Sequence, residues 1–111
     1  MIDPAEVAEV LDRAHDELLV RGWTHGKLED STGAVCAVGA LCAALGLPRT
    51  YGSVIFDDRA IAACALLPVV DCDPFPYMGT EYWNDAQTSV DDVLDAFRHA
   101  AKAAREEAGK A

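Results

Sequence analysis

Residues 33–47 are the feature that most constrains the fold, because this stretch contains no charged side chain. At 100° per residue, its bulky side chains share one face of a helix and its small side chains gather on the opposite face. The bulky set is Val35, Val38, Leu41, Cys42 and Leu45, and the small set is Cys36, Gly39, Ala40 and Ala43. A helix that is apolar all round is normally buried, and a face of small residues lets another helix approach closely. The stretch therefore predicts a buried central helix, since it is also shorter than the roughly 20 apolar residues of a membrane span.

Both ends of this central helix are marked in the sequence. Ser31 or Thr32 can cap its start, because a hydroxyl oxygen accepts a hydrogen bond from a free backbone N–H of the first turn. Gly46 followed by Pro48 is a typical helix stop. We therefore place the central helix over residues 34–46.

The first and last predicted helices are amphipathic. Asp3 and Glu6 frame Pro4 in a capping box that starts a helix over residues 4–21. Thr88 or Ser89 caps a helix over residues 89–107. The apolar positions are Val7, Val10, Leu11, Ala14 and Leu18 in the first helix, and Val90, Val93, Leu94, Phe97, Ala101 and Ala104 in the last. Each stripe predicts that its helix packs one side against a common core.

The remaining segments complete the predicted fold. Asp57 or Asp58 caps a helix over residues 57–67, which Pro68 closes. Residues 23–33 predict a linker with a short extended excursion, and residues 68–80 predict an irregular, proline-rich loop. With 111 residues, the chain has the length of one domain. We expect an all-α fold, a single domain over residues 1–111, built as a bundle of about four helices around the central one.

The charge of the chain limits its partners. Its 19 Asp and Glu outnumber its 9 Lys and Arg, which gives a formal net charge of −10. This charge disfavours nucleic acid and anionic membranes as direct partners, and a basic protein surface is its natural complement. The N-terminal residues lack the positive region and apolar run of a secretion signal, so we expect a cytoplasmic protein. In that compartment all four cysteines are expected to be free thiols.

Two chemical sites are worth testing against the sequence. A thiol enzyme would use Cys36 in the opening turn of the central helix, with His25 as base and Asp30 to orient it. Against this, free cysteine is common in cores and no flanking nucleophile signature is present. The four cysteines also lack the paired spacing of a metal site. We expect a protein without enzyme activity, metal or cofactor, with the thiol enzyme as the alternative.

Protein binding is the function that the sequence favours. One candidate surface is the acidic face of the first helix, with Glu9, Asp12 and Asp16, which is otherwise simply a solvated face. The other candidate residues are Phe75 and Tyr77 in the proline loop, and Trp83, Asn84 and Asp85, which predict a structural turn or a binding site. Mimicry of DNA by the acidic residues is a further alternative, although Arg13 and Arg21 interrupt them. Self-association through the small-residue face of the central helix is left open.

A set of motifs along the chain is similar to a known pattern. It comprises Gly22-Trp23, Gly26, Cys36 with Gly39-Ala40, and Trp83-Asn84-Asp85 before a Thr-capped terminal helix with Val93 and Leu94. In this order they resemble an uncharacterised family of small actinobacterial and actinophage proteins. The chain has Ala86-Gln87-Thr88 where the family motif ends in Gly-Arg-Thr. The resemblance implies a compact helical fold and a phage or actinobacterial source, and it implies no activity. Combined with the acidic charge, it suggests a protein that binds a host protein in the host cytoplasm.

Overall fold

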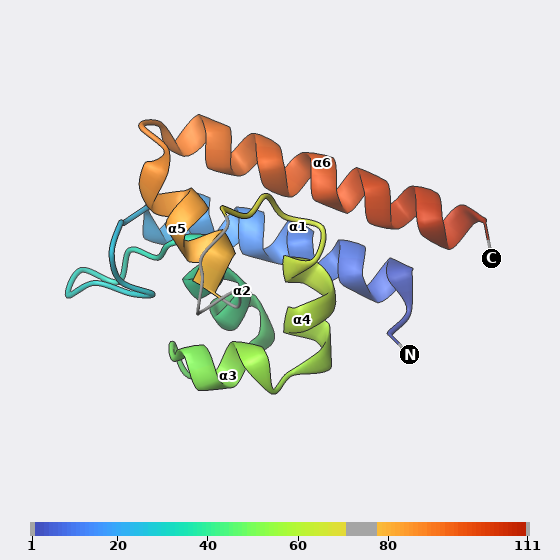
Figure 1. Cartoon of the computed structure of the whole chain (residues 1–111), viewed down its shortest axis with the longest axis horizontal. Helices are drawn as coiled ribbons and strands as arrows, with labels where there is room; N and C mark the ends of the chain where they lie inside the picture. Colours follow the sequence, from blue (N-terminus) through green and yellow to red (C-terminus); the bar gives the residue numbers. More distant parts are fainter. Residues whose placement is uncertain (1, 71–77, 111) are drawn as a thin grey trace.

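The computed structural model describes residues 2–70 and 78–110, and the regular structure of these residues is helical (Figure 1). The helices are α1 (Pro4–Arg21), α2 (Ala37–Leu45), α3 (Tyr51–Ile55), α4 (Asp58–Cys64), α5 (Gly79–Ala86) and α6 (Val90–Gly109). The described residues add two isolated bridges, which join Val35 to Trp23 and to Glu29 and form the predicted extended excursion. The all-α prediction is confirmed, but about four predicted helices become six.

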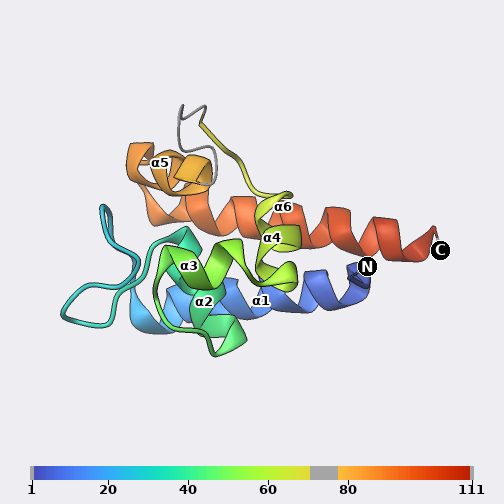
Figure 2. The same ribbon diagram turned by 60° about the horizontal axis from the view of Figure 1, so that its bottom comes forward.

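α1 and α6 form a long antiparallel pair, and both termini lie at the same end of it (Figures 1 and 2). Asp3 caps α1 by accepting from Ala5 N at 3.0 Å, and Ser89 caps α6 by accepting from Asp91 N at 3.1 Å. The facing stripes are buried together, with Val7, Val10, Leu11, Ala14 and Leu18 from α1 and Val93, Leu94, Phe97, Ala101 and Ala104 from α6. The predicted amphipathic helices are therefore confirmed, with α6 running slightly beyond its predicted end.

α2 lies at the centre of the fold and packs on α1. Its residues Ala37 to Cys42 are buried, and Gly46 ends it in the left-handed conformation at a φ of 69°, as predicted. The predicted start is wrong, because Cys36 is the N-cap and its sulfur accepts from Gly39 N at 3.3 Å. The residues before Cys36 are extended rather than helical, since Val35 takes part in both bridges.

At Gly39, the small-residue face of α2 is in close contact with a loop. A Cβ atom built on Gly39 would lie 1.8 Å from the carbonyl oxygen of Leu28. Cys36 N donates to the same carbonyl at 3.3 Å. The close approach predicted from the small side chains is therefore present, but its partner is the backbone of the segment between α1 and α2.

α3 and α4 pack against α2 in the middle of the chain (Figure 2). Asp57 caps α4 as predicted and accepts from the backbone N–H groups of Arg59 and Ala60 at 2.9 and 3.1 Å. α4 ends at Cys64, earlier than the predicted residue 67. α3 was not predicted, because Gly52 and Ser53 are weak helix formers in a five-residue helix.

The predicted turn at Trp83, Asn84 and Asp85 is wrong, because these residues belong to α5. These residues lie in the second half of a helix, where the sequence predicted a turn. The prediction failed because Gly79, Thr80 and the Asn-Asp pair have low helix propensity, and no side chain caps the start of α5. Phe75 and Tyr77 lie outside the described residues. Across residues 2–70 and 78–110, no helix has the length and apolar character needed to cross a membrane.

Candidate functional site

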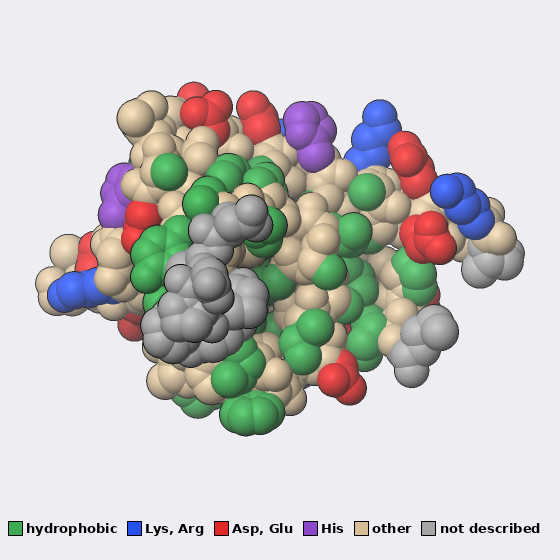
Figure 3. Space-filling view, viewed as in Figure 1, with side chains coloured by type: hydrophobic (Ala, Val, Ile, Leu, Met, Phe, Trp, Pro, Cys, Tyr) green, Lys and Arg blue, Asp and Glu red, His purple; other side chains and the backbone are tan. Residues whose placement is uncertain are grey.

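An apolar groove lies between the start of α1, the outer side of α4 and the last turns of α6. It encloses about 590 Å³. Its apolar lining includes Ile2, Val7, Ala62, Ala65, Leu66 and Ala104. Figure 3 shows the apolar side chains of this face gathered over α4 and between the ends of α1 and α6. Alanines contribute to the lining from two parts of the chain, Ala62 and Ala65 at α4 and the residue after it, and Ala103 and Ala104 in α6.

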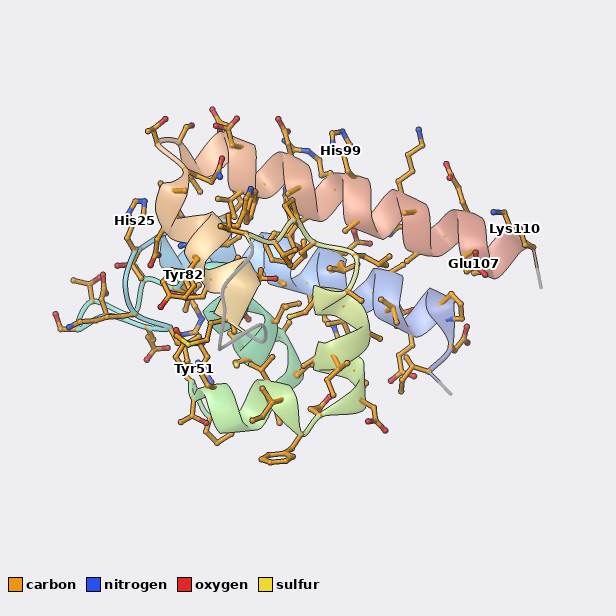
Figure 4. The ribbon with its side chains drawn as sticks, viewed as in Figure 1. His25, Tyr51, Tyr82, His99, Glu107 and Lys110 are labelled. Atoms are coloured by element: carbon orange, nitrogen blue, oxygen red, sulfur yellow. The ribbon has the colours of Figure 1, made fainter. Side chains whose placement is uncertain are left out.

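The surroundings of the groove combine apolar and acidic side chains. Glu106 and Glu107 of α6 and the following Lys110 are among its lining residues, and Figure 4 places Glu107 and Lys110 beside the C-terminus. The Nζ of Lys110 lies 4.0 Å from the carboxylate of Glu107 and pairs with it. Glu106 is the other acidic residue of the lining. Ile61 of α4 is 47 % exposed, and Leu66, two residues past the end of α4, is 42 % exposed. Ile61 is one helical turn from Ala65 and so extends the apolar surface beyond the groove.

A second group of polar residues joins α5 to the start of α2. Asn84 is completely buried, and its Oδ1 accepts from Ala37 N at 3.0 Å and from the indole Nε1 of Trp23 at 2.7 Å. Its Nδ2 donates to the carbonyl of Thr24 at 3.2 Å. The neighbouring Asp85 accepts from Gly26 N at 2.9 Å. The motif residues therefore satisfy backbone groups in the loop before α2, and Asn84 is in the interior rather than on a binding surface.

Glu81 completes this α5 contact. It is 3 % exposed, and its Oε2 accepts from the thiol of Cys36 at 2.7 Å. Burial and the carboxylate of Glu81 raise the pKa of the Cys36 thiol well above its usual range, and burial also raises the pKa of Glu81. A nucleophilic cysteine needs the opposite shift. Sequence reasoning did not single out Glu81, because an isolated Glu in a weakly helical segment carries no signal.

The residues of the thiol hypothesis have separate partners in the structure. The Nε2 of His25 donates to the carbonyl of Gln87 at 3.1 Å, and the centroid of its ring lies 4.1 Å from that of Trp23. Asp30 binds the backbone and hydroxyl of Thr32, which lower its pKa. Cys36 instead pairs with Glu81. The structure therefore orients His25 and Asp30 towards loop backbone, where each holds a turn.

Two acids of the acidic face of α1 are bound by neighbouring side chains of the fold. Asp12 forms an ion pair with Arg105 of α6, and Asp16 accepts from His15 at 3.2 Å. His15 in turn bonds Arg98 of α6 at 2.9 Å. Glu9 is exposed on the same helix. The predicted partner surface of Glu9, Asp12 and Asp16 thus has two of its three acids in contacts within the fold, and its role in binding stays a prediction.

The described cysteines are free thiols, namely Cys36, Cys42 and Cys64, while Cys72 lies outside the described residues. Burial and the nearby Cys42 raise the pKa of Cys64 to about 12. In the described ranges, no group of three or more His, Cys, Asp or Glu side chains is placed to hold a metal ion.

Comparison with known proteins gives one match. No curated protein and no solved structure is significantly similar to the chain. Three residues of the motifs on which the resemblance to an uncharacterised family rests, Trp23, Cys36 and Asn84, take part in the hydrogen bonds between α5, the loop before α2 and the start of α2. Residues 3–103 match the model of the family of unknown function DUF6197, and the chain belongs to this family.

Proposed function

We propose that the protein is a non-catalytic interaction module that binds an amphipathic helix of a partner protein in the groove between α1, α4 and α6. In the phage interpretation of the sequence, this partner is a protein of the bacterial host. The groove with its exposed apolar margin is the observation that carries the proposal. Larger exposed apolar patches rimmed by polar residues typically mark interaction sites.

The shape of the groove favours a helical occupant. Residues of three helices line it, and the lining includes small side chains such as Ala62 and Ala104. An amphipathic helix inserts apolar side chains at i, i+3 or i+4 and i+7 into a groove of this kind. Leu66 and Ile61, both partly exposed, would be desolvated by such a helix. Fully burying an exposed leucine-sized side chain contributes about 1.5–3 kcal/mol. Because Leu66 and Ile61 are already about half buried, each would contribute roughly half of that, which makes these two positions the expected anchors.

The charge of the protein favours a basic polar face on that helix. Glu106 and Glu107 are among the lining residues of the groove, and the whole chain carries a formal net charge of −10. Charge complementarity mainly speeds association and selects partners, and added salt weakens it. We therefore expect a partner helix with lysine or arginine flanking its apolar side, and faster binding at low ionic strength.

The proposal is tested by affinity capture with a matched pair of variants. Leu66→Asp places a charge in the groove, whereas Val20→Asp makes the same kind of change at a side chain that is 85 % exposed on α1. Val20 lies about 20 Å along the helix axis from Val7 at the groove. Tagged wild type and Val20→Asp should retain one stoichiometric protein from an actinobacterial lysate after nuclease treatment.

Leu66→Asp should lose this protein and should bind the purified partner at least about tenfold more weakly, because about 1.4 kcal/mol corresponds to tenfold in affinity. Both variants are compared by circular dichroism to establish that they fold. Equal retention by both variants, at equal affinity, would exclude the groove as the binding surface.

A further inference from the structure

α5 is held to the rest of the molecule largely by polar contacts. Its buried residues are Gly79, Thr80, Glu81 and Asn84, none of which carries a large apolar side chain. By contrast, α6 buries an entire apolar stripe that includes Phe97. Trp83 is the one bulky apolar side chain of α5 that packs on the main core, and it is only partly buried. The position of α5 therefore depends on the hydrogen bonds of Glu81, Asn84 and Asp85 to a greater extent than that of any long helix.

Glu81 is the critical member of these contacts because it is buried and incompletely paired. Its Oε2 is satisfied by the thiol of Cys36 at 2.7 Å, but its Oε1 has no hydrogen-bond partner among the described residues. An ionised carboxylate buried in this way has a large desolvation cost, and a single thiol donor offsets only part of it. The protonated form of Glu81 fits the same site at a much lower cost.

The other polar groups near Glu81 do not supply the hydrogen bond that its Oε1 lacks. They are the thiol of Cys36 at the start of α2, Asp85 on α5 itself, His25 in the loop before α2, and the phenol of Tyr51 on α3. Figure 4 shows Tyr51 between the start of α3 and α5. Asp85 adds negative charge, and His25 is the one basic group of the four. Because His25 is bound to the carbonyl of Gln87, it offers Glu81 no direct hydrogen bond in the structure.

We propose that α5 is a proton-controlled clasp over Cys36. When Glu81 is protonated, α5 docks on the start of α2 and covers the thiol. When Glu81 releases its proton to solvent, the uncompensated carboxylate favours an open form in which α5 leaves α2 and both Glu81 and Cys36 meet water. The inference is independent of partner binding in the groove, which lies at the other end of α6 from α5 (Figure 1).

The direction of the pH dependence follows from linkage. In the open form Glu81 has the ordinary pKa of about 4.3, and in the docked form burial raises that pKa. Between the two pKa values, the ratio of open to docked molecules rises up to about tenfold per pH unit, because opening releases one proton. Below and above this window the ratio is constant. The docked form is therefore more highly populated in mild acid than in neutral solution.

The test measures how fast Cys36 reacts with dithiodipyridine across a pH series, using mass spectrometry to assign each labelled cysteine. Rates are divided by those of a small unstructured thiol to remove the intrinsic pH dependence. Cys42 serves as the internal control, because it is equally buried in α2 but lies near Arg49 and Asp57 rather than under α5. We expect the normalised rate at Cys36 to rise about tenfold per pH unit within the window, and Cys42 to react much more slowly.

Glu81→Gln removes the titrating proton, and Glu9→Gln makes the same change at an exposed side chain of α1. The first variant should lose the pH dependence at Cys36, and the second should keep it. Amide hydrogen exchange of wild-type α5, compared with α6 and corrected for intrinsic rates, gives the same test without a variant. The clasp is refuted if Cys36 and Cys42 react at equal rates, if Glu81→Gln keeps the wild-type pH dependence, or if α5 exchange shows no pH dependence beyond that of α6.

Discussion

Gly39→Ala should destabilise the protein even though alanine is the better helix former. The new Cβ would lie 1.8 Å from the carbonyl oxygen of Leu28 and 2.8 Å from its carbonyl carbon, so the backbone of the loop must move. Overpacking of this kind costs about 2 kcal/mol, and loss of the hydrogen bond from Cys36 N to the Leu28 carbonyl adds about 1 kcal/mol. Better helix propensity returns about 1 kcal/mol. The net prediction is a loss of about 2 kcal/mol in the free energy of unfolding.

Gly52→Ala is the matched control for this experiment. Gly52 is also helical, in α3, but its nearest neighbour to a new Cβ is the hydroxyl oxygen of Thr50 at 3.9 Å, which is ordinary van der Waals contact. This substitution should leave stability unchanged or raise it by up to about 1 kcal/mol. Urea unfolding followed by circular dichroism measures both variants. If Gly39→Ala were as stable as the wild type, the proposed tight contact between α2 and the loop would be wrong.

Three further predictions address other contacts of the fold. Asn84→Ala leaves the N–H groups of Ala37 and the Trp23 indole without their buried acceptor, so thermal unfolding should show a loss of about 3 kcal/mol; an unchanged melting temperature would contradict this. The side-chain hydrogen bond from Arg59 lowers the pKa of Asp57, so the stabilisation by its ionised form is present above about pH 4 and is lost as the pH falls through the lower folded-state pKa. Urea midpoints of Asp57→Asn should therefore be lower than wild type at neutral pH and should converge on it in acid, whereas parallel curves would exclude this linkage. Arg105→Gln breaks an exposed ion pair with Asp12 and should change stability by less than about 0.5 kcal/mol by chemical denaturation, while a loss above about 1 kcal/mol would show that the pair matters more than its exposure allows.

The long helices were predictable because several local signals agree in each. α1 has an N-cap, a proline at its first position and a regular apolar stripe, and α6 has a serine cap and the same periodicity. The burial of α2 followed from its lack of charge, and its end followed from Gly46. The short helices were missed because α3 and α5 are built from weak helix formers, so their formation depends on tertiary contacts that periodicity cannot reveal.

The candidate site was much less visible in the sequence. The groove is lined in part by alanines of α4 and α6, and an alanine-rich segment is also typical of ordinary close packing. Glu81 was not identified, because its importance comes from burial and from its contact with Cys36, which is 45 residues away in the chain. Cys36 was singled out for a position in the opening turn of the central helix; it is instead the N-cap of that helix, and its partner is a carboxylate rather than a histidine. Trp23 and Asn84 were likewise named as parts of separate motifs, and only the fold shows the hydrogen bond that joins them.

The most direct test of the proposed interaction is to map the partner contact by NMR. Uniformly ¹⁵N-labelled protein is titrated with the purified unlabelled partner, and amide chemical shifts are followed for α1, α4 and α6. The groove proposal predicts that the largest changes lie at Val7, Ala62 and Ala104, with smaller ones around Glu106. Changes confined to the acidic side of α1 around Asp12 and Asp16, with the groove amides unmoved, would contradict it and would instead support the acidic face as the binding surface.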